Sequence, residues 1–117
     1  MNDQPPPAFK IVDATEWAAA EAEGVYGGSA VDRADGFIHL STQAQLAETA
    51  AKHYAGRPDL MLLTVDLDAL GDAVVWEPSR GGALFPHIYG PLPVAAVTAR
   101  RAFAVTADGG MAFETVA

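Results

Sequence analysis

Residues 35–42 read DGFIHLST, and this stretch decides how the middle of the chain folds. Successive side chains of a strand point to opposite faces, so Ile38 and Leu40 share one face of the extended segment. His39 and Ser41 share the other face. The stretch therefore predicts a short strand with one apolar and one polar face, followed directly by a helix.

Two helices are predicted from the residues that start them. Asp13 is an N-cap residue with a glutamate three positions later, and it opens an alanine-rich helix through about Ala22 that Gly24 ends. Thr42, with a glutamine three positions later, forms a second capping box. The helix that it opens is expected to run to about Tyr54.

The strands are predicted from apolar composition between turn residues. Residues 60–65 are apolar almost without interruption, which is typical of a strand buried on both faces. Segments 27–29 and 32–36 have loop composition, 66–70 suggest a single helical turn, and Asp-Gly-Gly at 108–110 is a hairpin signal. The predicted strands are 8–12, 37–41, 60–65, 74–77, 96–105 and 111–116. Two helices and about six strands in an irregular order predict an α+β fold.

The chain has 117 residues, of which 50% are apolar and 19% charged. A chain of this length is expected to form one domain, because two separate cores would each be too small to bury enough surface. Three consecutive prolines favour an extended backbone, so residues 1–7 are expected to be a disordered lead-in and residues 8–117 the domain. The N-terminus lacks the features of a signal peptide, which predicts a cytoplasmic location.

Charge and cysteine content exclude several classes of function. Fifteen acidic and seven basic residues give a net charge of −8, which disfavours generic binding to nucleic acid or to an anionic membrane. No apolar run approaches the roughly 20 residues that span a bilayer. The chain has no cysteine, so disulfides, thiolate catalysis and cysteine zinc sites are excluded. A small-molecule or nucleotide ligand is the expected partner, and the oligomeric state stays open.

His39 and Ser41 are the first candidate functional residues. They lead into a helix N-terminus, where free backbone N–H groups and the helix dipole favour an anion or a ribose hydroxyl. Each also has a structural alternative. His39 is then a hydrogen-bond donor within the fold, and Ser41 only caps the second helix.

A second group of candidates lies in the later strands. Glu77 ends a strand beside Trp76, where partial burial would raise its pKa toward a value useful for acid–base chemistry. His87 and Tyr89 share a face if their segment is extended, and they follow a glycine pair. The structural alternatives are an exposed strand end for Glu77 and a turn-shaping role for His87.

Four motifs resemble the signature of a bacterial family called domain of unknown function 952 (DUF952). They lie at residues 35–42, 62–66, 76–78 and 85–92, and the resemblance extends over about residues 8–100. The family has no settled activity, so the resemblance implies a fold more than a function.

The motif His39-Leu40-Ser41 also resembles, more weakly, the catalytic half of RNA 2′-phosphotransferases of the ADP-ribosyltransferase superfamily. That resemblance implies a split or strongly bent small β-sheet flanked by two helices, with NAD held between two small sheets and His39 lining the cleft. The related enzymes carry Arg-His on an earlier strand, where this chain has Lys10-Ile11. Arg80 is the candidate for a phosphate-binding arginine.

These observations lead to one principal hypothesis and two alternatives. The principal hypothesis is a cleft that binds a nucleotide, with NAD as a substrate, no covalently bound cofactor and ADP-ribosyl or glycosyl transfer as the activity. The alternatives are a non-catalytic binding module and a metal site in which two histidines and a carboxylate converge. Whether the chain is an enzyme is left open. The predicted catalytic residues are His39, Glu77 and His87, and the predicted ligand-binding residues are Ser41, Trp76, Arg80 and Tyr89.

Overall fold

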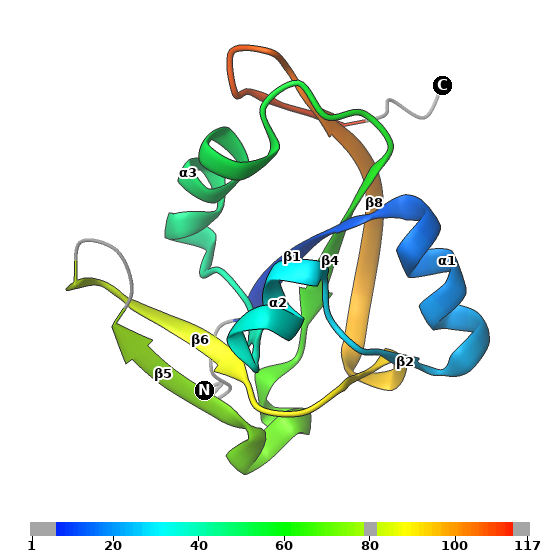
Figure 1. The fold of residues 1–117 in the computed structure, drawn as a ribbon, viewed down its shortest axis with the longest axis vertical. Helices are drawn as coiled ribbons and strands as arrows, with labels where there is room; N and C mark the ends of the chain where they lie inside the picture. The colour runs from blue at the N-terminus through cyan, green and yellow to red at the C-terminus, as the bar shows by residue number, and fades with distance from the viewer. Residues whose placement is uncertain (1–6, 79–81, 114–117) are drawn as a thin grey trace, which may run out of the picture.

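The computed structural model describes residues 7–78 and 82–113, and Figure 1 shows their arrangement. Most of the predicted lead-in at residues 1–7 lies outside this part of the chain. No helix in the described ranges is long and apolar enough to cross a membrane. The elements, in chain order, are β1 (Ala8–Asp13), α1 (Ala14–Glu23), β2 (Val25–Tyr26), α2 (Ala30–Asp35), β3 (Ile38–His39), α3 (Gln43–Tyr54), β4 (Leu60–Val65), the 3₁₀ segment η1 (Leu67–Ala73), β5 (Val74–Pro78), β6 (Leu84–Ile88), β7 (Leu92–Pro93), the 3₁₀ segment η3 (Val94–Ala96), β8 (Val97–Val105) and β9 (Met111–Phe113).

The strands form three sheets, all with antiparallel pairing. The four-stranded sheet has the order β1-β4-β8-β9, the three-stranded sheet has the order β3-β6-β5, and β2 pairs with β7. The predicted hairpin at 108–110 joins β8 to β9 as expected, and β9 is described as far as Phe113. Helices and strands that do not alternate regularly confirm the α+β class.

Strand β4 is the centre of the four-stranded sheet. It pairs with β1 on one side and β8 on the other, and Leu60, Leu63 and Val65 have no exposed surface. The prediction of an interior strand over 60–65 is therefore confirmed.

The two faces of β4 contribute to two different apolar clusters. Leu60 and Leu62 pack in one cluster with Leu46 of α3, whereas Leu63 packs in the other with Trp17 of α1. Helices α1 and α3 thus cover opposite faces of the four-stranded sheet (Figure 1). The second cluster also includes side chains of β3 and β6, so the three-stranded sheet packs on the α1 side.

The predicted helix caps are present. The carboxylate of Asp13 accepts hydrogen bonds from the first turn of α1, and Gly24 ends that helix with a φ of 84°. This left-handed backbone favours glycine. Thr42 and Gln45 make the reciprocal bonds of a capping box at the start of α3.

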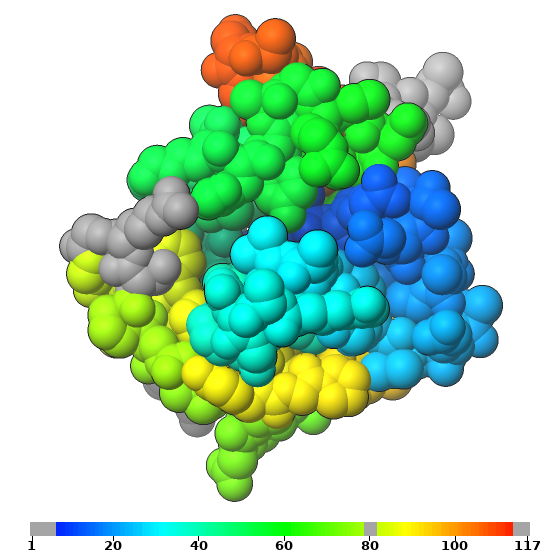
Figure 2. Space-filling view, viewed as in Figure 1, coloured from blue at the N-terminus to red at the C-terminus, as the bar shows by residue number. Residues whose placement is uncertain are grey.

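Helix α2 corrects the prediction of a loop over 32–36, and the described residues accordingly contain three α-helices where two were expected. Ser29 and Asp32 form a capping box, and Gly36 ends the helix in the left-handed conformation. Figure 2 shows α2, in cyan, at the middle of one face of the molecule. The flanking glycines had suggested a loop, but the capping motif stabilises the first turn of a helix.

Candidate functional site

The structure brings His39 and His87 together, as the sequence had predicted. They are directly opposite each other on the antiparallel strands β3 and β6, and their ring centroids lie 5.3 Å apart. The 71° angle between the ring planes gives an edge-to-face contact. Antiparallel pairing is the physical cause, because opposed residues point to the same side of the sheet.

Phe37 contacts the three polar rings of the site. Its ring stacks on that of His87 at a centroid distance of 4.2 Å and packs at a tilt against His39 at 4.7 Å. Tyr89 is also within ring contact, at 5.2 Å. We refer to Phe37, His39, His87 and Tyr89, together with Glu77, as the imidazole cluster.

Glu77 binds two members of the cluster through one oxygen. His87 Nδ1 and the Tyr89 hydroxyl each lie 2.8 Å from Glu77 Oε1. The hydrogen bond from His87, followed by that from Tyr89, lowers the pKa of the Glu77 carboxyl. The expectation that burial would raise this pKa is therefore wrong, because donors to the ionised form outweigh desolvation. The same contact raises the pKa of the Tyr89 hydroxyl.

His39 is bound by two carboxylates of α2. Its Nδ1 lies 2.6 Å from Asp32 Oδ1, and its Nε2 lies 2.9 Å from Asp35 Oδ2. The backbone N–H of His39 also donates to Asp32. Both ring nitrogens are thus occupied by side chains of the protein.

Asp32 and Lys10 form the buried support of the cluster. Lys10 Nζ lies 2.9 Å from Asp32 Oδ2, and both residues are buried. Burial acts to raise the pKa of Asp32, but the Lys10 ammonium and the hydrogen bonds from His39 and Ser29 outweigh it, so the pKa is lowered. Sequence reasoning missed Asp32, Asp35 and the role of Lys10. The available signals were a lysine within the apolar strand β1 and the Ser-x-x-Asp motif that caps α2.

Three predicted ligand-binding residues are not part of the cluster. The hydroxyl of Ser41 is buried and lies 2.9 Å from that of Thr49 on α3. Trp76 points to the other face of the three-stranded sheet, because it pairs with Pro86 whereas its neighbour Val75 pairs with His87. Arg80 lies outside the described residues.

The alternative of a metal site is not supported by the geometry. Within residues 7–78 and 82–113, no three histidine, cysteine or acidic side chains are grouped so that they could hold a metal ion. The nitrogens of His39 are bound to aspartates, and Nδ1 of His87 is bound to Glu77.

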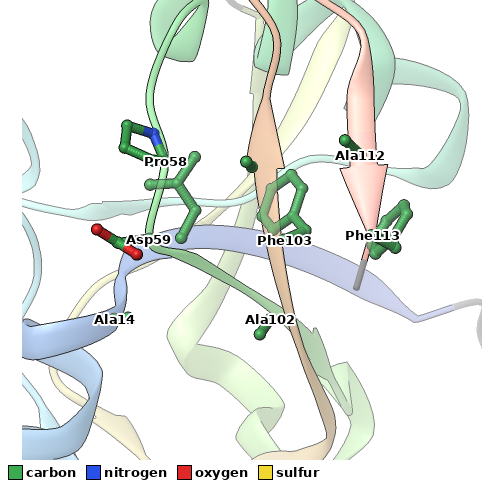
Figure 3. Close-up of a pocket in the computed structure, with 9 residues that line it drawn as sticks. Ala14, Pro58, Asp59, Ala102, Phe103, Ala112 and Phe113 are labelled. Atoms are coloured by element: carbon green, nitrogen blue, oxygen red, sulfur yellow. The ribbon is translucent and has the colours of Figure 1, made fainter. Parts of the chain in front are cut away.

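Two hollows of the described surface lie elsewhere. The larger, of about 350 Å³, is lined by Ala14, Asp59, Phe103 and Phe113, among others, and lies between the start of α1, the start of β4 and the strands β8 and β9 (Figure 3). The smaller, of about 170 Å³, lies between α1 and the segment from β2 to α2. Neither includes a predicted site residue, so the expected nucleotide cleft is not one of these hollows. The imidazole cluster lies instead at a partly exposed face, where Tyr89 is 46% exposed.

Comparison with known proteins identifies the family. Residues 11–100 match the family described as "Protein of unknown function (DUF952)". The crystal structure of protein CC0527 from Caulobacter crescentus is 50% identical, with a TM-score of 0.85 over 90% of this chain and 92% of that chain. The solution NMR structure of CC0527 is 51% identical, with a TM-score of 0.78 over 88% of this chain and 89% of that chain. Comparison with curated proteins gave no significant match. A family match over most of the sequence, together with relatives of this identity, shows that the chain belongs to the DUF952 family.

Proposed function

We propose that the imidazole cluster binds a nucleotide that carries a ribose and a cationic ring, of the NAD type, and that the chain transfers the ribosyl group. The observation that carries the proposal is the Glu77 carboxylate, kept ionised by hydrogen bonds from His87 and Tyr89 beside an aromatic surface. Its side chain is 35% exposed, so a ligand can reach it.

The chemistry of such a transfer matches this arrangement. When the ring leaves the ribosyl carbon, positive charge develops on the sugar, and a nearby carboxylate stabilises that charge. The faces of Tyr89 and Phe37 attract a cationic ring through their π-systems, an interaction of about 0.5–2 kcal/mol. The Glu77 carboxylate suits a cationic ring better than a bare phosphate, because two negative groups repel each other.

His39 has a supporting place in this proposal. Because Asp32 and Asp35 occupy its nitrogens, its ring borders the ligand and does not donate to it. Its packing on Phe37 holds the aromatic surface in position.

A second candidate is a binding module without transfer activity. Its support is that the polar groups of the cluster are largely bound to one another, which describes a rigid recognition surface as well as a catalytic one. The two candidates differ in whether bound nucleotide is cleaved.

The test is calorimetric titration with NAD and ADP-ribose, combined with chromatographic measurement of nicotinamide release. Wild type should bind NAD, and Glu77→Gln should lose most of the release. The matched control is Glu48→Gln, since Glu48 is an exposed glutamate on α3 that pairs only with Lys52 among the described residues. Binding without release would favour the module. The absence of binding to either nucleotide would contradict both candidates.

A further inference from the structure

We propose that the two histidines of the cluster divide the proton chemistry between them. His39 is a doubly protonated imidazolium held by Asp32 and Asp35, whereas His87 is a neutral ring whose bare Nε2 is the proton acceptor of the site. The protonation states stand on geometry alone, while the acceptor role rests on the proposed function. Asp32 and Asp35 thereby become positioning residues.

The two aspartates determine the state of His39. An ionised carboxylate only accepts hydrogen bonds, and a neutral imidazole has a single N–H to donate. Contacts of 2.6 Å and 2.9 Å at the two nitrogens are both satisfied only when each nitrogen carries a proton. Hydrogen bonds of this charge-assisted kind are about twice as strong as neutral ones.

The charges around His39 balance in this state. Lys10 on β1 faces the same Asp32 carboxylate, and Asp35 is paired with His39. Two positive and two negative groups then form a neutral set across β1, α2 and β3. Arg33, the other charged group near the end of α2, lines the hollow beside α1. With a neutral His39 the set would keep an uncompensated negative charge, in part buried.

His87 is in the opposite situation. Within the described part of the chain, its only carboxylate partner is Glu77 on β5, at Nδ1, and Nε2 has no hydrogen-bond partner there. The residue is 4% exposed, and its ring centroid lies 5.3 Å from that of His39. An N–H at Nε2 would lie in a buried ring with no acceptor among the described residues, and an unsatisfied buried donor costs free energy. The proton of the neutral ring is on Nδ1, where it is donated to Glu77, so the lone pair is on Nε2.

A proton acceptor at this place suits a second substrate that gives up a proton as it attacks, such as a hydroxyl compound. The C–N bond to the cationic ring breaks with its electron pair going to that ring, and the hydroxyl oxygen forms the new C–O bond. The hydroxyl proton moves to His87 Nε2, and Glu77 balances the resulting positive charge. His39 has no lone pair to offer and takes no proton.

The test is ¹⁵N NMR of the histidine ring nitrogens of the labelled protein at pH 7, without ligand. His39 should show protons on both nitrogens, and His87 a proton on Nδ1 only. The third histidine, His53, is exposed on α3 and serves as an internal reference. A neutral His39, or a His87 protonated at Nε2, would overturn the assignment.

A variant of Asp35 tests the same assignment. Asp35 is preferred to Asp32, because Asp32 is buried and its replacement can unfold the protein. Asp35 is 48% exposed, so Asp35→Ala should fold, and without this acceptor one nitrogen of His39 should lose its proton. Asp72→Ala is the control, because Asp72 is an exposed aspartate on η1. If Asp35→Ala leaves His39 doubly protonated, the two aspartates do not determine the state of His39. If the ring states are as expected but NAD does not bind, the proposed function fails while the assignment stands.

Discussion

Lys10 and Asp32, 22 positions apart in the sequence, meet in a buried ion pair with 2.9 Å between Nζ and Oδ2. Lys10 belongs to the four-stranded sheet and Asp32 to α2. The same carboxylate accepts two hydrogen bonds from His39, which belongs to the three-stranded sheet. One aspartate therefore joins two sheets and a helix.

Replacing this aspartate should destabilise the fold strongly. Asp32→Asn leaves the Lys10 ammonium buried without its counter-ion, and breaking such a pair costs about 3–5 kcal/mol in free energy of unfolding. Urea denaturation measures this loss. The double variant with Lys10→Met should recover much of it, since no unpaired charge then remains. A loss below about 1 kcal/mol in the single variant would show that the pair contributes little to the stability of the fold.

The stability contributed by Asp32 should depend on pH in a defined direction. Its pKa in the folded protein lies below the ordinary value of 3.8, so the ionised form is favoured by folding. The contribution is fully present above pH 3.8 and is lost as the pH falls through the folded value. Asp32→Asn should flatten the dependence of unfolding free energy on pH below about 4. The other carboxyls whose pKa is lowered are the same in both proteins. Parallel curves for wild type and variant would therefore contradict the lowered pKa of Asp32.

The interior position of β4 predicts a large cost for truncating its side chains. Leu62→Ala should lower the free energy of unfolding by about 2–5 kcal/mol through lost burial and the cavity left behind. Val31→Ala on α2 is the control, since Val31 is 64% exposed and should change stability by no more than about 0.5 kcal/mol. Similar losses of stability at both positions would contradict the interior position of β4.

The bond between Tyr89 and Glu77 predicts a shift in an alkaline titration. Because this hydrogen bond raises the pKa of Tyr89, Glu77→Gln should lower that pKa toward the ordinary value of 10.0. Phenolate absorbance follows the ionisation, and Tyr89→Phe identifies the contribution of Tyr89 among three tyrosines. Glu48→Gln should leave the curve unchanged. An unshifted Tyr89 in Glu77→Gln would mean that the bond does not persist in solution.

Local patterns predicted much of the fold. Features that depend on a few neighbouring residues were predicted, and the structure contains them. They are the apolar strand β4, the N-caps Asp13 and Thr42, and the hairpin at 108–110. Helix α2 was missed because six residues between glycines resemble a loop, although Ser29 and Asp32 carried the capping signal.

The candidate site was predictable only in part. His39, His87 and Tyr89 stood out as polar residues in strand-like segments, and they do lie together. Their partners Lys10 and Asp32 could not be predicted, because no local pattern specifies which residues meet across sheets. Trp76, a predicted ligand-binding residue, lies on the opposite face from the cluster, and its face could not be predicted because it depends on pairing with β6.

The position of β4 between β1 and β8 has a consequence for biosynthesis. Ala8 pairs with Val65, and Val65 in turn pairs with Val97, so the sheet joins segments from both halves of the chain. Such non-local pairing is slow to form, because long loops must close before the contacts stabilise them. On the ribosome, β4 emerges well before β8 and lacks one of its neighbours during that interval. The apolar edge of β4 therefore stays without its second strand partner until β8 has been made.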